Sequence, residues 1–235
     1  MAKATPVYGE SQIKELGFPE AIQRRPGMYI GGRGNLTHLV AEVIDNSIDE
    51  AMAGACNRVE VVLERDGSAT VTDRGRGVPV GIHPESGKSA LEMAFTLLHT
   101  GGKFDQSVYT TSGGLHGVGV KATNALSEWL EVTVCRDGVR YRQRYEHGYV
   151  KTPVQILAPH SDHIIGVVGE RGADAAVRMH ADRKLGTGTS VRFLPSSQFM
   201  EVTRFDFAAV AHRLEIAAYL IPGLELSVAD LRGDE

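Results

Sequence analysis

The chain has few cysteines, few aromatic residues and no long apolar run. Only two cysteines, Cys56 and Cys135, and one tryptophan occur in 235 residues. Two thiols in a chain of this size do not make a disulfide framework, and no signal peptide precedes them, so we expect a reducing, cytoplasmic setting. No apolar run approaches the roughly 20 residues that a membrane-spanning helix needs. We therefore expect a cytoplasmic protein without membrane association.

An excess of basic charge is also missing. The formal net charge is -4 and the isoelectric point is near 6.1, with lysine and arginine scattered along the chain. An autonomous nucleic-acid binder normally carries a basic stripe, so any contact with DNA would have to come through other domains or partners. The 42% of apolar residues suffices for a sizeable core. One domain, or at most two small ones, is expected.

Hydrophobic periodicity and turn signals predict an α+β fold. Asp66-Gly67 and Asp137-Gly138 are typical of tight hairpin turns between strands. Because the expected helices do not alternate regularly with the strands, the sheet should be mainly antiparallel. We expect strands at 58–63, 68–72, 129–136, 139–146, 189–194 and 224–229, and helices at 18–25, 36–55, 89–99, 118–126 and 205–220.

Two segments stand apart from the rest of the chain. Residues 1–17 are polar and aperiodic, as in an arm that needs something to lie against, and the domain itself is expected over 18–235. Residues 155–186 look like an insertion between two strands, since they alternate short apolar runs with charges and contain His160, His163 and His180. The histidine spacing fits no tight zinc pattern and no cysteine assists, so a polar hairpin extension is favoured over a metal site.

The helix expected over 36–55 carries the first functional signal. Its apolar residues recur at steps of three and four, and Glu42, Asn46 and Asp49 fall on a separate narrow stripe. A carboxylate and a carboxamide one turn apart suit a metal–nucleotide site, as base and as oxygen ligand. From this helix alone, a solvated polar face is the favoured alternative.

Two glycine motifs add to that signal. Asp73-x-Gly75-x-Gly77, followed by Pro79, stands where a strand ends, so a carboxylate could bind an exocyclic amine while a flat ring approaches the backbone. The stretch 113–119, GGLHGVG, opens a helix, and its amides could cradle phosphates. GKS at 87–89 lacks the spacing of a phosphate loop, so we reject that interpretation. Residues 117–122 match a relaxed dinucleotide fingerprint but do not follow a buried strand, so we reject that interpretation too.

Longer strings resemble a known family. EVIDNSIDEA, DRGRGVP and SGGLHGVGVKATNALS resemble the three nucleotide-binding motifs of the GHKL ATPases. RRPGMYIGG, LLHTGGKFD and the YEHG at Tyr145 narrow the resemblance to the B subunits of the bacterial type II topoisomerases, DNA gyrase and topoisomerase IV. It covers nearly the whole chain except about 155–186. Overall similarity favours gyrase; topoisomerase IV, or another GHKL ATPase such as a mismatch-repair protein, is the alternative.

The resemblance implies a fold and a set of roles. The family has a Bergerat-type fold, a mixed and mainly antiparallel sheet with helices on one face and a glycine-rich lid over ATP. It implies that Glu42 is the general base, that Asn46 ligates Mg²⁺, and that Asp73 binds the adenine amino group with help from Thr189 through water. Arg136 matches a position that contacts inhibitors at the pocket mouth. The other implied nucleotide-binding residues are Tyr8, Glu50, Arg76, Gly77, Pro79, Gly102, Lys103, Gly114, Leu115, His116, Gly117, Val118, Gly119 and Val120.

The resemblance also implies partners. Tyr8 and Ile13 match an arm that crosses to the other protomer of an ATP-dependent homodimer. The A subunit of DNA gyrase or of topoisomerase IV, DNA bound through the complete enzyme, and aminocoumarin-type inhibitors of the ATP site are implied as well. The family places a further subdomain after this one, so this chain alone should hydrolyse ATP weakly or not at all. Arg74, Thr110 and Lys121 depart from the family's pattern at the pocket rim and lid.

Overall fold

The computed structural model describes residues 16–98 and 118–233, and its centre is a single mixed sheet. Across the sheet the strand order is β7-β6-β4-β3-β8-β2-β1-β9, with β5 paired to β4. Only β9 runs parallel to its neighbour, β1, among the described strands. The predicted α+β class with a mainly antiparallel sheet is confirmed. The strands are β1 (Arg58–Leu63), β2 (Ala69–Asp73), β3 (Ser127–Arg136), β4 (Val139–Glu146), β5 (Tyr149–Val150), β6 (Gln155–Leu157), β7 (Ile164–Val167), β8 (Gly188–Pro195) and β9 (Glu225–Asp230).

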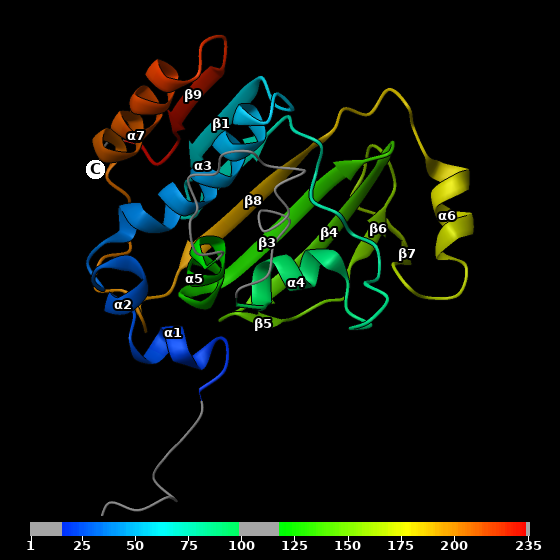
Figure 1. Cartoon of the computed structure of the whole chain (residues 1–235), viewed down its shortest axis with the longest axis horizontal. Helices are drawn as coiled ribbons and strands as arrows, with labels where there is room; N and C mark the ends of the chain where they lie inside the picture. The colour runs from blue at the N-terminus through cyan, green and yellow to red at the C-terminus, as the bar shows by residue number, and fades with distance from the viewer. Residues whose placement is uncertain (1–15, 99–117, 234–235) are drawn as a thin grey trace, which may run out of the picture.

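Helices α3, α4 and α5 lie over the same face of this sheet, with α7 beside β9 and α6 at the opposite edge (Figure 1). The five predicted helices are present, each within three residues of its expected ends, where these are described. The short α2 and the exposed α6 were not predicted. The helices are α1 (Glu20–Arg24), α2 (Gly27–Ile30), α3 (Leu36–Met52), α4 (Ala90–Thr96), α5 (Gly119–Ala125), α6 (Ala173–His180) and α7 (Phe207–Leu220).

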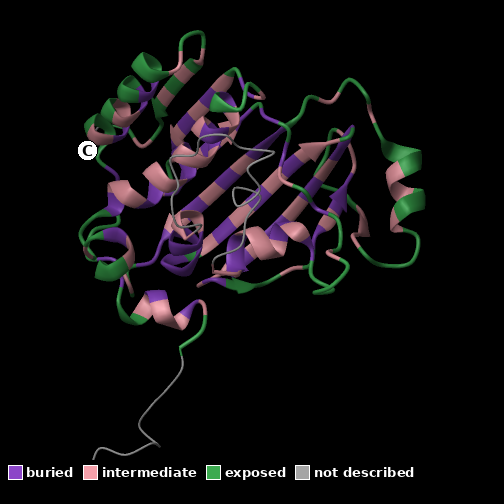
Figure 2. Ribbon diagram, viewed as in Figure 1, coloured by how far each residue is buried: buried purple, intermediate pink, exposed green. Residues whose placement is uncertain are grey.

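Alternation along the strands separates a covered face from an open one. Burial follows a strict period of two in β1, β2 and β4, as Figure 2 shows in the banded strands. The covered side presents Val61 and Val71, opposite each other in the β1–β2 register and 1% exposed. On the open side, Trp129 lies between the guanidinium groups of Arg144 and Arg192, 4.7 and 5.6 Å from its ring centroid. Burial of the covered side therefore drives the packing of the helices onto the sheet.

Helix α3 is anchored by the apolar stripe that the sequence predicts. Leu39, Val40, Val43 and Ile44 are at most 2% exposed. Burying each such side chain is worth about 1.5–3 kcal/mol. The helix ends shortly before Gly54, whose φ of +71° lies in the left-handed region that glycine tolerates best.

The segment 155–186 is a hairpin followed by a helix. The predicted hairpin is present as β6 and β7, which pair antiparallel. Helix α6 was not predicted, because none of its residues is buried and its apolar pattern is short. Ala173 and Val177 alone among its residues pack against the core. This segment therefore extends the sheet at the β7 edge.

Of the described helices, none has both the length and the apolar surface required to cross a bilayer.

Candidate functional site

Asp73, the last residue of β2, is a buried carboxylate with an organised environment. Its side chain is 8% exposed, and Oδ1 accepts hydrogen bonds from the amides of Gly75 (2.8 Å) and Thr189 (3.2 Å). Oδ2 is engaged more weakly, by the Ser47 hydroxyl on α3 at 3.4 Å. Burial raises the pKa of Asp73 above its ordinary value, and the two amide hydrogen bonds oppose that rise. The group is thus a fixed acceptor with one oxygen available to a ligand.

Three glycines let the backbone pass closely around this carboxylate. A Cβ on Gly75 would lie 2.9 Å from Asp73 Oδ1, and one on Gly77 would lie 2.8 Å from the carbonyl oxygen of Cys135. At Gly188 a Cβ would come within 2.0 Å of the Asp73 carbonyl oxygen. Gly77 also has φ +76°, in the left-handed region. No other residue type fits these positions without moving its neighbours, so the predicted Asp-x-Gly-x-Gly motif has a steric basis.

Residues far apart in the sequence meet at this end of the sheet. Arg76 makes a two-point ion pair with Glu50, through Nη2 to Oε1 at 2.7 Å and Nε to Oε2 at 3.0 Å. Arg136, at the end of β3, donates from Nη1 to the Gly77 carbonyl at 2.8 Å. Thr189 Oγ1 accepts the amide of Val78 at 3.2 Å. The structure therefore brings together Glu50, Arg76, Gly77, Arg136 and Thr189 around Asp73.

Glu42 lies on α3, on the side facing the start of α5. Its Oε1 is 3.0 Å from His38 Nε2, one turn earlier on the same helix. The hydrogen bond to Glu42 raises the pKa of His38, an effect that partial burial opposes. A Cβ on Gly119 would lie only 1.5 Å from Glu42 Oε2, so a larger residue where α5 begins would have to displace the Glu42 side chain. His38 was not among the predicted site residues; its i, i+4 spacing from Glu42 is the signal that could have found it.

The polar stripe of α3 is not a solvated face. Asp49 is 1% exposed and Ser47 is 3% exposed, while Asn46 and Glu42 are half-buried. Buried polar groups are retained where they have hydrogen-bonding partners, and Ser47 bonds both to Asp73 and to the carbonyl of Val43. The stripe is therefore not fully solvated, and the roles predicted for Glu42 and Asn46 stay predictions.

The remaining predicted residues have varied positions. Val118, Gly119 and Val120 open α5 and are half-buried, with Gly119 against Glu42. Pro79 is exposed, two residues beyond the buried Gly77. Lys121 is buried in α5 at 3% exposure, and Arg74 is exposed, 4.0 Å from Glu60. Outside the described residues lie Tyr8, Ile13, Gly102, Lys103, Thr110, Gly114, Leu115, His116 and Gly117.

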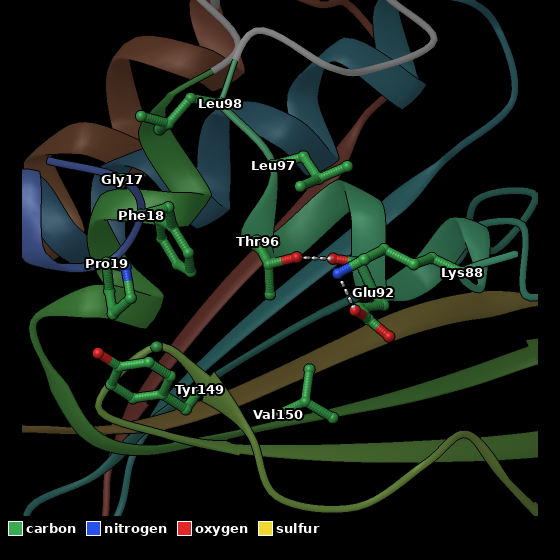
Figure 3. Close-up of a pocket in the computed structure, with 11 residues that line it drawn as sticks. Gly17, Phe18, Pro19, Lys88, Glu92, Thr96, Leu97, Leu98, Tyr149 and Val150 are labelled. Atoms are coloured by element: carbon green, nitrogen blue, oxygen red, sulfur yellow. Dashed lines mark hydrogen bonds and ion pairs between the residues drawn. The ribbon is translucent and has the colours of Figure 1, made fainter. Parts of the chain in front are cut away.

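A cavity of about 420 Å³ lies beside α4 (Figure 3). It is lined by Gly17–Pro19, by α4 and the residues after it, and by β5, with an ion pair of 2.6 Å between Lys88 and Glu92. None of the predicted site residues lines this cavity. The candidate site is therefore located by its polar geometry around Asp73 and Glu42, not by cavity size.

The described residues contain no group of three or more His, Cys, Asp or Glu side chains that could hold a metal ion. A cation at this site would need ligands from a bound molecule and water in addition to the protein.

Known proteins are similar to this chain over most of its length. Residues 31–197 match the family described as histidine kinase-, DNA gyrase B- and HSP90-like ATPase. Over 225 residues, 95% of the chain, it is 48% identical to the DNA gyrase B subunit of Thermotoga maritima, and over 227 residues it is 47% identical to that of Archaeoglobus fulgidus. The chain spans about a third of the length of these relatives, 32% and 33%.

A solved structure is similar as well. The 43K ATPase domain of Thermus thermophilus gyrase B, in complex with an aminocoumarin, superposes with a TM-score of 0.72 and is 35% identical. The match covers 92% of this chain and 49% of that one. The resemblance stated from the sequence motifs is confirmed, and so is the GHKL-type fold with its antiparallel-dominated sheet.

Proposed function

The chain belongs to the family of histidine kinase-, DNA gyrase B- and HSP90-like ATPases, and from this premise we propose that it is the ATP-binding and ATP-hydrolysing part of a DNA gyrase B subunit. In the complete enzyme, ATP closes a homodimer and hydrolysis reopens it. This cycle drives DNA strand passage and negative supercoiling together with the gyrase A subunit, in the cytoplasm. DNA is bound by the complete enzyme and not by this part alone. The single observation that carries the proposal is the buried, amide-oriented carboxylate of Asp73.

Adenine recognition follows from the geometry of that carboxylate. Oδ2 of Asp73 accepts a hydrogen bond from the exocyclic amine, and Thr189 assists through a water molecule. Gly77 lets the flat ring approach the backbone, and the Glu50–Arg76 pair borders it. A site built to accept a hydrogen bond discriminates strongly against a base that cannot donate one, because its buried acceptor is then left unpaired.

Residues of α3 carry out the hydrolysis step in this proposal. Glu42 takes a proton from water as the water oxygen forms its bond to the γ-phosphorus and the bond to the ADP oxygen breaks. His38, 3.0 Å from Glu42, holds the carboxylate in position. Asn46, one turn further on, supplies an oxygen of the kind that Mg²⁺ prefers, and phosphates and water would complete the shell. When bound, Mg²⁺ neutralises phosphate charge.

Inhibitor binding is part of the same proposal. The Thermus thermophilus structure holds an aminocoumarin. In this chain Arg136, fixed on the Gly77 carbonyl, is the residue proposed to contact that class of compound at the mouth of the adenine site.

Replacing Asp73 by asparagine tests the adenine assignment. The new carboxamide oxygen can still accept the amides of Gly75 and Thr189, but its N–H₂ group then presents a donor to the adenine amine. We expect the affinity for a non-hydrolysable ATP analogue, measured by calorimetry, to fall at least tenfold, since an unpaired buried group costs about 1–3 kcal/mol. Asp137→Asn, at an 83% exposed turn residue at the same end of the sheet, is the matched control. Equal affinities of the two variants would remove Asp73 from the adenine site.

The same variant has a stability signature. Because burial raises its pKa, ionised Asp73 costs folding free energy at pH values above its folded pKa. Asp73→Asn should therefore leave the unfolding free energy at neutral pH unchanged or raise it, by up to about 1 kcal/mol. This gain should shrink as the pH falls through the folded pKa of Asp73 and vanish below about 4, where the carboxyl is protonated in the unfolded state as well. Loss of binding with unchanged or increased stability separates a functional role from a structural one.

A further inference from the structure

Residues 155–186, here called the insertion, form the β6–β7 hairpin and α6 and then return to the sheet beside the candidate site. After α6 the chain crosses the ends of β4 and β3 to reach β8 (Figure 1). The crossing ends at Gly188, whose Cα has no room for a Cβ against Asp73, and at Thr189, whose amide binds the Asp73 carboxylate. Residues 182–187, here called the exit segment, therefore directly precede in sequence the two residues that contact Asp73.

The exit segment packs against the β3–β4 turn through backbone-to-backbone contacts. The amide of Asp182 donates to the carbonyl of Gly138 at 2.8 Å. A Cβ on Gly138 would lie 2.9 Å from the Asp182 carbonyl oxygen and 3.1 Å from its carbon. Backbone atoms cannot rotate away as a side-chain end can, so the two segments are in fixed contact at this point.

The exit segment has its own internal order. Oδ1 of Asp182 accepts the amide of Lys184 at 2.9 Å, and its carbonyl accepts the amide of Leu185 at 2.9 Å. Oδ2 is 2.9 Å from Nε2 of His160, in the loop between β6 and β7. Asp182 thus ties the exit segment to the hairpin of the insertion.

A second turn of the insertion contacts the segment that follows Gly77. At Gly169, after β7, a Cβ would lie 3.1 Å from Cδ1 and Cγ1 of Ile82. Ile82 follows Pro79 by three residues, on the segment that leaves Gly77. The insertion therefore contacts both the segment after Gly77 and the turn after Arg136.

These contacts converge on Arg136. It is the last residue before the Asp137-Gly138 turn, and its Nη1 donates to the Gly77 carbonyl at 2.8 Å. We propose that the insertion forms the outer wall of the adenine site and holds the β3–β4 turn, and with it Arg136, in place over Gly77. Arg136 is the residue acted upon, and Asp182 and Gly138 are the positioning residues. Resting on the proposed function, this makes the insertion a determinant of affinity for ligands that extend past the adenine ring.

The two classes of ligand should respond differently. A nucleotide is held by Asp73 at one end and by its phosphates at the other, so a displaced Arg136 affects it little. An aminocoumarin that contacts Arg136 loses a charge-assisted hydrogen bond when the turn moves. The ratio of the two affinities is therefore the readout, and a change in overall stability does not alter it.

Gly138→Ala is the test, with Gly67→Ala as its matched control. Both glycines follow an aspartate in a hairpin turn, with φ +76° and +84°, so both variants carry similar backbone strain. A Cβ on Gly67 meets only the end of the Leu194 side chain, at 3.8 Å. By calorimetry on the 235-residue chain, Gly138→Ala should weaken an aminocoumarin about tenfold or more, as expected for one lost hydrogen bond to a charged group. A non-hydrolysable ATP analogue should be weakened less than about threefold, and Gly67→Ala should change neither.

A second pair keeps the test decisive if Gly138→Ala does not fold. Asp182→Ala removes the side-chain contacts of the exit segment, and Asp174→Ala, in the first turn of α6, removes another carboxylate of the insertion. Only Asp182→Ala should lower the aminocoumarin affinity relative to that of the ATP analogue. If the positioning variants match their controls while the ATP analogue binds normally, the insertion has no such role. If the unaltered chain binds no ATP analogue, the proposed function itself fails, and the inference fails with it.

Discussion

The two longest helices, α3 and α7, lie side by side and bury very different surfaces. Helix α3, with 17 residues, buries eight of them, including the polar Ser47 and Asp49. Helix α7, with 14 mostly apolar residues, buries only three and leaves Tyr219 and Leu220 81% and 73% exposed. Composition alone would assign these surfaces the other way round. Burial of polar groups on α3, rather than apolar content, marks the helix that carries the candidate site.

The cause of the difference is what each helix packs against. Helix α3 packs on β2, where the buried hydroxyl of Ser47 has a partner in the Asp73 carboxylate. Helix α7 flanks β9, an edge strand that is itself largely exposed. The two helices are joined by an ion pair between Asp45 and Arg213.

The largest expected effect is on catalysis and belongs to α3 alone. Glu42→Ala should lower ATP turnover about 100- to 10,000-fold, the range for a general base, while a non-hydrolysable analogue still binds. Turnover would be measured in a polypeptide of the full length of the gyrase B relatives. Glu215→Ala, which removes an exposed carboxylate from α7 and also its 3.4 Å contact with a histidine on the same helix, is the matched control. Persistent turnover in Glu42→Ala would exclude it as the base.

The next largest effect is the loss of stability when a buried leucine of α3 or α7 is truncated. Leu39 on α3 and Leu214 on α7 are 0% and 4% exposed, so truncating either to alanine should cost about 2–5 kcal/mol of unfolding free energy. Leu220→Ala at the exposed end of α7 should stay within about 0.5 kcal/mol. Urea unfolding of the three variants measures this. A large loss at Leu220 would mean that the exposed end of α7 contributes to the fold in solution.

Much of this could be predicted from sequence because it depends on local periodicity and turn chemistry. The buried stripe of α3 and the hairpins at Gly67 and Gly138 follow from patterns within one segment. The close approach of Gly119 to Glu42 has a different origin, since it brings together two distant parts of the chain. The pairing of Asp182 with Gly138 is likewise a tertiary contact that no local pattern encodes. Helix α6 escaped prediction because almost none of its surface is buried.

The ion pair that joins the two helices should have a middle-sized effect. Burial raises the pKa of Asp45, and Arg213 opposes that rise, so the carboxylate depends on its partner. Arg213→Ala should therefore cost about 1–2 kcal/mol by leaving Asp45 partly buried without a cation. Adding Asp45→Asn to that variant should recover part of the loss, because the unpaired charge is gone. Additive losses in the double-mutant cycle would show that the two side chains are not coupled.

The smallest expected effect is a pH dependence on α3. Glu42 raises the pKa of His38, aided by the charge of Asp45, so protonated His38 stabilises the fold below its unfolded pKa of about 6.5 and the contribution is lost as the pH rises through the folded value. His38 is 35% exposed, and after solvent screening the difference should be only about 0.3 kcal/mol. His38→Gln should flatten the change in unfolding free energy between about pH 6 and pH 8.5 by this amount. His212→Gln on α7, at a histidine that is 70% exposed, is the matched control for the loss of a histidine side chain. A slope that survives in His38→Gln would show that another group titrates, and that α3 contributes no pH dependence to stability in this range.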